Sequence, residues 1–390
     1  MDKCINYNKQ KLNTTFAIKD LLLIVAFLLF LFSDFVQLPF FEIFWLCSAI
    51  ILIVLNYKNF KHYRNEKITK TMKLFNILVL FLFLVHLIVG LLRPESVIRL
   101  YGLTKRMLIP CIMFYCFYKN NKLIYLWRII IPFLICLNIV FFYAHIIVGN
   151  DYVEGFGSVN VIGGLNIIVL PLVLSRIVKN RNCIENLFNI ILTFLIVINA
   201  IIFDATTYKY LFYGFTVLLI FSCIFKSKKY KKLYCNLAGL AVLCLIILPI
   251  ILVITKILPT DFFLYQNRYI IWARGYDQFG ELSIIEQVLG SGNNIVRMLT
   301  NSFEAHNITM DVLMIYGWVG VILLFFFFWG VVRHSKKINI SIRSIFMTTL
   351  LFYTIICFMN PYFTGVTYFQ IISWVAILGF INMNDAQIKG

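Results

Sequence analysis

Charged residues are scarce in this sequence. They make up 13% of its 390 residues, roughly half of the share that a soluble domain of this length carries. Apolar residues account for 61%, and phenylalanine alone occurs 39 times. A single water-soluble core cannot bury so much apolar surface. The composition therefore excludes an ordinary soluble domain and indicates a chain whose surface faces lipid.

Paired cysteines and a cleavage signal are missing too. None of the ten cysteines forms a C-x-x-C pair, and most lie inside apolar runs, where cysteine behaves as a small apolar residue. This pattern supports neither a metal centre nor redox chemistry, so we expect no metal and no cofactor. The first apolar run lacks a small-residue cleavage site and is followed by further spans, so we predict no removable signal peptide.

Long apolar runs divide the chain into spans, each of which needs about 20 apolar residues to cross a membrane as a helix. The predicted spans are residues 18–33, 39–56, 74–92, 100–118, 129–148, 159–176, 184–203, 208–225, 233–257, 307–331, 344–359 and 364–382. The expected fold class is all-α: a polytopic membrane protein of about 12 transmembrane helices. Residues 1–390 would form one integral membrane domain without internal repeats.

Most of the 35 basic residues lie in the N-terminal segment, the C-terminal tail and the even-numbered loops. Cytoplasmic loops are enriched in lysine and arginine. We therefore place both termini and the even-numbered loops, including the one that carries Arg333 and Arg343, in the cytoplasm. The net charge of +18 then reflects membrane topology, and we expect no nucleic-acid partner.

The longest connection between spans, residues 258–306, falls on the opposite, extracytoplasmic side. It is polar, punctuated by glycine and too long for a simple connection. Within it, residues 280–289 have the spacing of an amphipathic helix that lies on a membrane surface. The other outer loops are short or acidic. We predict one large extracytoplasmic loop and no separate soluble domain.

Nine basic residues fall on the predicted outer side, where topology disfavours them. They are Arg93, Arg99, Lys105, Arg106, Lys209, Lys256, Arg268, Arg274 and Arg297. Snorkelling at the interface, or pairing with a loop acid, is one explanation. The other is an anion site, because guanidinium groups match phosphate oxygens and stabilise the charge that develops on a leaving pyrophosphate.

His306 stands at the end of the large loop, with Glu304, Asn307 and Asp311 near it in the sequence. An imidazole can accept a proton near neutral pH and so activate a hydroxyl. An interfacial histidine bonded to water is the alternative. Carboxylates inside the spans are few, whereas transporters place several ionisable residues at mid-depth. The charge pattern therefore favours chemistry at the outer boundary over translocation.

An ordered set of short motifs surrounds the large loop. In chain order they are Arg268-Tyr-Ile-Ile-Trp272, Gly290-Ser-Gly292, His306-Asn307 and Gly317-Trp-Val-Gly320. This order resembles the R-x-x-x-W, G-x-G, H-N and G-x-x-G signature of the O-antigen ligase and polymerase (Wzy-like) superfamily. Gly155-Phe-Gly-Ser-Val-Asn160 resembles the family's entry to its sixth span. Thr206-Thr-Tyr-Lys209 resembles its S-R turn, but lysine replaces arginine and one residue is inserted.

The resemblance implies a GT-C-like glycosyltransferase in the bacterial cytoplasmic membrane. Its donor would be a glycan on undecaprenyl pyrophosphate, and a flippase and a chain-length regulator would be its partners beside membrane lipid. The implied catalytic residues are His306, which activates the acceptor hydroxyl, and Arg268. The implied substrate-binding residues are Arg274, Arg99, Arg106, Lys209, Trp272, Asn160 and Glu304. Trp272 either offers an apolar face to a sugar or isoprenoid, or is a packed interfacial tryptophan.

Three functions stay open at this stage. The first is a polymerase that joins lipid-linked repeat units of an O antigen, a capsule or a similar surface polysaccharide. The second is an O-antigen ligase of the same architecture, which transfers the glycan to a lipid A core. The third is a repeat-unit flippase or other transporter, which the long outer loop and the absence of a repeat disfavour.

Overall fold

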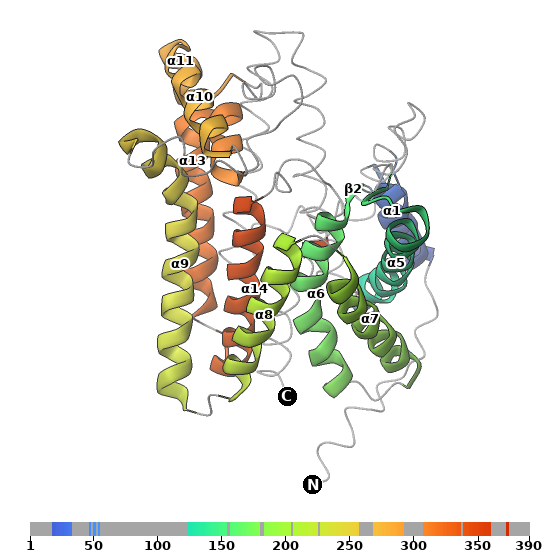
Figure 1. Ribbon diagram of the computed structural model, residues 1–390. Coiled ribbons are helices and arrows are strands. Elements are labelled where there is room, and N and C mark those ends of the chain that lie inside the picture. The colour runs from blue at the N-terminus through green and yellow to red at the C-terminus, as the bar shows by residue number, and fades with distance from the viewer. Residues whose placement is uncertain are drawn as a thin grey trace.

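The protein is shown as a computed structural model in Figure 1. The structure describes residues 18–32, 47, 50–51, 54, 123–153, 157–179, 183–203, 206–224, 227–256, 268–291, 307–336, 338–359 and 372–373. Almost all of this chain is helical, as predicted, because in lipid each backbone polar group must find its partner within the chain.

The elements of the described chain occur in the following order along the sequence. They are α1 (Ile18–Phe32), α5 (Leu123–Tyr143), the π-helix η4 (Ala144–Val148), β1 (Tyr152–Val153), β2 (Gly157–Ser158), α6 (Val159–Lys179), α7 (Cys183–Ile202), α8 (Thr206–Ile224), α9 (Lys228–Thr255), α10 (Arg268–Gly280), α11 (Ile284–Leu289), α13 (Ile308–Ser335) and α14 (Ile340–Met359). The two strands pair as a small antiparallel hairpin that leads into α6.

Six helices of the described chain are long and apolar enough to cross a membrane. They are Leu126–Val148, Val159–Ile177, Cys183–Ile202, Lys228–Thr255, Ile308–Ser335 and Ile340–Met359. The protein is thus a polytopic helical membrane protein, and the matching sequence predictions are confirmed to within a few residues. The predicted spans 39–56, 74–92, 100–118 and 364–382 lie wholly or largely outside the described residues.

The largest differences from the predicted boundaries lie at the basic segments. The helices α9, α13 and α14 extend further into the basic segments than predicted, so that Arg333 and Arg343 belong to helices and not to a loop. Long basic side chains allow this, because their apolar stems remain in the helix while the charge reaches the headgroups. The amphipathic helix predicted for residues 280–289 is the shorter α11, which begins after a turn.

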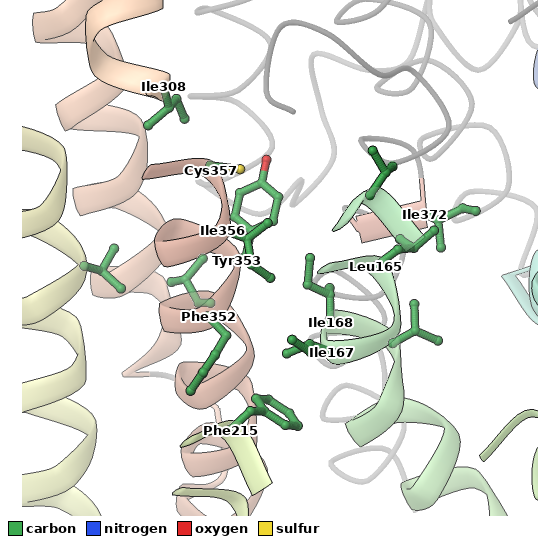
Figure 2. Packing of buried hydrophobic residues seen from close by; sticks show 14 of the residues in the cluster. Leu165, Ile167, Ile168, Phe215, Ile308, Phe352, Tyr353, Ile356, Cys357 and Ile372 are labelled. Atoms are coloured by element: carbon green, nitrogen blue, oxygen red, sulfur yellow. The ribbon is translucent and has the colours of Figure 1, made fainter. Parts of the chain in front are cut away.

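Two groups of helices meet at α14. On one side α9 and α13 pack on α14, and on the other side α6 and α8 pack on it, with α7 and α5 beyond α6 (Figure 1). Figure 2 shows Tyr353 and Ile356 of α14 on the side that faces Leu165 and Ile168 of α6. The helices α6, α13 and α14 are mostly buried, whereas α7 exposes most of its surface, as expected for a helix at the lipid boundary.

Candidate functional site

The inner face of α10 is fixed by two aromatic side chains. Trp272 is only 6% exposed, and its ring meets that of Phe358 at the end of α14 edge-on, with centroids 5.7 Å apart. Phe279, two turns further along, is buried against Trp318 of α13 at 6.2 Å. Of the two readings of Trp272, the structure shows the packed tryptophan.

The two arginines predicted to hold the pyrophosphate, Arg268 and Arg274, both belong to α10. Arg268 is the first residue of α10 and lies four residues, about one helical turn, before Trp272. Arg274 is exposed, and six positions along an α-helix correspond to a rotation of roughly 240° about its axis. The shared grip of Arg268 and Arg274 on one pyrophosphate stays a prediction.

The G-x-G and G-x-x-G motifs touch each other through their first glycines. A Cβ atom on Gly290, at the end of α11, would lie 2.1 Å from the carbonyl oxygen of Ile315. A Cβ atom on Gly317 would lie 2.5 Å from the carbonyl oxygens of Gln287 and Val288. Both glycines also have positive φ angles, +89° and +65°. Only glycine satisfies both demands, so this backbone contact locks the end of α11 onto α13.

The same contact explains an interruption within α13. The backbone of Gly317 is not helical, and it separates a first part, Ile308–Tyr316, which is buried throughout, from a longer second part. Irregular backbone at membrane depth is tolerated where protein surrounds it. Here the end of α11 occupies the interruption, and Ser291 donates a hydrogen bond to the carbonyl oxygen of Met314 at 3.4 Å.

Asn307 of the H-N motif caps α13. Its side-chain oxygen accepts hydrogen bonds from the backbone N–H groups of Thr309 and Met310, at 2.9 and 3.1 Å. Its Nδ2 atom donates to the carbonyl oxygen of Phe358 at 3.0 Å. Sequence reasoning gave Asn307 no role of its own, although asparagine ahead of an apolar run is a common helix N-cap and could have been recognised.

A buried carboxylate lies just inside this cap. Asp311 is fully buried in the first turn of α13, where the helix dipole favours negative charge. Next to it in the same turn, Thr309 donates a hydrogen bond to the carbonyl oxygen of Ile246 at 2.7 Å, which ties α13 to α9. The start of α13 is thus held by polar contacts with both α9 and α14.

The first turns of α6 and α8 carry two further predicted residues. The ring of Tyr208 packs so closely on α6 that a Cβ atom on Gly163 would lie 2.5 Å from it. This contact sets the first turns of the two helices side by side, and with them Asn160 and Lys209. Both side chains are half-buried.

A histidine–carboxylate pair that sequence reasoning missed lies at the same end. Nδ1 of His145, in η4, is 2.5 Å from a carboxylate oxygen of Asp151. The imidazole also meets the ring of Phe203 edge-on at 5.4 Å. A separation of six residues matches neither helical nor strand spacing. The π-helical turn and the left-handed Gly149 bring the two side chains together, so no periodic sequence pattern predicts this pair.

Four predicted site residues, Arg99, Arg106, Glu304 and His306, lie outside the described residues. Among the residues that are described, no three His, Cys, Asp or Glu side chains come together as a metal site. The sequence matches no known protein-family model and no curated protein.

Proposed function

We propose that the protein is a glycosyltransferase that polymerises undecaprenyl-pyrophosphate-linked oligosaccharide repeat units at the outer face of the cytoplasmic membrane. The observation that carries this proposal is the convergence of four separate motifs on the start of α13 and the end of α14. Trp272 and Asn307 both contact Phe358, and Gly290 meets Gly317.

This convergence supports a shared site because two of the anchors, Trp272 and Asn307, are close in the chain to a predicted catalytic residue. Arg268 lies one turn before Trp272, and His306 directly precedes Asn307. Motifs that served packing alone would not need an arginine and a histidine beside their anchors. The buried Asp311 adds a carboxylate to the same helix end.

In the proposed reaction an acceptor sugar hydroxyl attacks the anomeric carbon of the donor. A new C–O bond forms as the bond to the pyrophosphate oxygen breaks, and His306 takes the hydroxyl proton. Arg268 stabilises the charge on undecaprenyl pyrophosphate as it leaves. Arg274, Arg99, Arg106 and Lys209 assist in holding the anionic donor, and the longer glycan stays on the acceptor's carrier lipid.

The proposal includes twelve spans, a GT-C-like fold and cytoplasmic termini. Its orientation is supported by the basic residues of helices that are far apart in sequence. Arg128 and Arg176 meet at the shared end of α5, α6 and α7. Arg343 meets residues at the start of α9 and the end of α13. We call this side the basic end. A cytoplasmic basic end leaves α10, α11 and the start of α13 on the outer side, where lipid-linked glycans are exposed.

Substitution in the producing cell tests the proposal. Arg268→Ala and His306→Ala should leave single repeats in place of the long-chain glycan ladder, while the protein still inserts. Arg333→Gln serves as the control, because Arg333 lies at the basic end, stacked on Trp329, and should leave the ladder intact. Normal ladders in both site variants would reject the proposal. Free polymer on its carrier lipid would assign the protein as a ligase instead.

A further inference from the structure

A buried arginine lies at the basic end, far from the proposed reaction. Arg343, in the first turn of α14, is only 5% exposed. Its Nε donates to the hydroxyl of Ser335 at 3.4 Å, and its Nη2 donates to the side-chain oxygen of Asn236 at 3.2 Å. Both acceptors are neutral. These partners therefore give Arg343 no counter-charge. Burying a cation without an opposite charge is costly in free energy.

The surrounding helices cannot supply that charge. Packed against α14 are α6, α8, α9 and α13. Residues 205–260 and 312–384 contain no aspartate or glutamate, and neither does α6. The acid of α13, Asp311, lies at the opposite end of that helix, roughly 35 Å away. Within the part of the chain that the structure describes, no helix packed on α14 therefore supplies a counter-charge to Arg343.

The other charged side chains near Arg343 are also positive, so they strengthen the attraction of this region for an anion. The first turns of α9 carry Lys228, Lys229, Lys231 and Lys232. The last turn of α13 carries Arg333 and His334. An anion that reaches Arg343 is therefore favoured by the field of the whole basic end.

Asn236 opens a path from the buried guanidinium to the surface. Its side chain is exposed, and because its oxygen accepts from Arg343, its amide N–H groups can donate to a ligand. No nitrogen of Arg343 is both fully buried and without a hydrogen-bond partner. The guanidinium donors that Ser335 and Asn236 do not use therefore reach the surface. An anion next to Asn236 would meet both sets of donors.

The surroundings of Asn236 indicate what carries the anion. Leu233 and Leu240 lie three and four residues from it, on the same face of α9, Leu237 is the next residue in the chain, and each of the three leucines is more than half exposed. A polar donor set beside an apolar stripe matches a phospholipid, whose phosphate binds the donors while an acyl chain lies along the leucines. Arginine is well suited to phosphate oxygens.

We propose that Arg343 and Asn236 form a binding site for the phosphate of an anionic phospholipid in the leaflet at the basic end. The bound phosphate neutralises Arg343 and ties α9, α13 and α14 together at the lipid boundary. Anionic lipid would thereby stabilise the half of the protein that carries the proposed catalytic motifs. The site is independent of the proposed function.

The test compares thermal unfolding of the purified full chain in zwitterionic detergent with added phosphatidylglycerol or phosphatidylcholine. Phosphatidylglycerol should raise the melting temperature, and phosphatidylcholine should not. Arg343→Gln should weaken the apparent affinity for phosphatidylglycerol at least about tenfold. The matched control Arg333→Gln removes the same charge from an exposed arginine and should respond like the wild type. If Arg343→Gln and the wild type respond equally, the proposal is wrong.

Two further arms make the result specific. Asn236→Leu keeps Arg343 but removes the exposed amide, and it should also weaken the response to phosphatidylglycerol, which keeps the test decisive if Arg343→Gln does not fold. Inorganic phosphate without lipid should have little effect. If phosphate alone reproduces the full stabilisation in an Arg343-dependent manner, the site binds free phosphate, and the assignment to phospholipid is overturned.

Discussion

Two groups of helices in this protein treat a buried arginine at the basic end in opposite ways. In the first group, Arg128 of α5 and Arg176 of α6 share the carboxylate of Glu185 from α7, at 2.7 and 3.3 Å. In the second group, Arg343 of α14 meets only neutral partners from α9 and α13. The first group balances its own charge, and the second requires an external anion.

The same contrast holds for neutral polar groups deeper in the bundle. The helices α5, α6 and α7 of the first group each contribute one buried asparagine to a hydrogen-bonded cluster. Asn138 and Asn166 exchange side-chain hydrogen bonds at 3.1 and 2.8 Å, and Asn199 donates to Asn138 at 2.7 Å. In the second group, a backbone contact at Gly290 and Gly317 joins α11 to α13, in addition to side-chain hydrogen bonds such as that of Thr309 with α9. The first group therefore resembles a scaffold, whereas the second group carries the motifs of the proposed reaction.

The largest expected effect is that of Gly317→Ala. The new methyl group would overlap the backbone of α11 and force an L-residue into a positive φ angle, so we expect a loss of at least about 4 kcal/mol or no folded protein. The control is Gly149→Ala in the first group, where φ is +70° but the space is open, with an expected cost of about 1 kcal/mol. Equal melting temperatures would show that the glycine contact does not hold the second group.

A smaller effect is expected from removing the acid of the first group. Glu185→Gln leaves Arg176 largely buried and without its carboxylate, which should cost about 2 kcal/mol after allowance for the solvent around Arg128. Arg343→Gln, measured without anionic lipid, should cost nothing or stabilise the protein, because it removes an unbalanced charge. Unfolding in detergent measures both changes in the free energy of unfolding. A larger loss for Arg343→Gln than for Glu185→Gln would contradict the difference between the two groups.

The smallest effect concerns the asparagine cluster. Asn138→Leu removes the residue that links the other two, so we expect a loss of about 1 kcal/mol. Asn189→Leu is the matched control in α7. Asn189 is also fully buried, but neither of its amide atoms has a hydrogen-bond partner among the described residues, so the substitution should be neutral or stabilising. A similar loss in both variants would mean that the cluster contributes nothing specific.

The sequence predicted the spans of the described chain well, because the length and polarity of apolar runs follow directly from bilayer thickness. It could not predict the burial of Arg343. The residue sits in a basic segment that normally marks a solvated loop, and only the packing of α9 and α13 around it removes it from water.

The motifs around the candidate site were visible in the sequence, but the contacts between them were not. The glycine motifs were visible, yet no spacing rule says that Gly290 touches Gly317, because the two belong to separate elements. Likewise, the ring contact of Trp272 and the hydrogen bond of Asn307 meet at Phe358, which no motif includes. Tertiary packing decides such contacts, and local patterns do not encode them.

The proposed activity is tested most directly by reconstitution. The purified protein, in phospholipid vesicles with a single lipid-linked repeat unit as both donor and acceptor, should produce a ladder of glycans that grows by whole repeats and release undecaprenyl pyrophosphate. His306→Ala protein that melts like the wild type should produce neither. If folded wild-type protein leaves the repeat unit unchanged, the protein is not a polymerase.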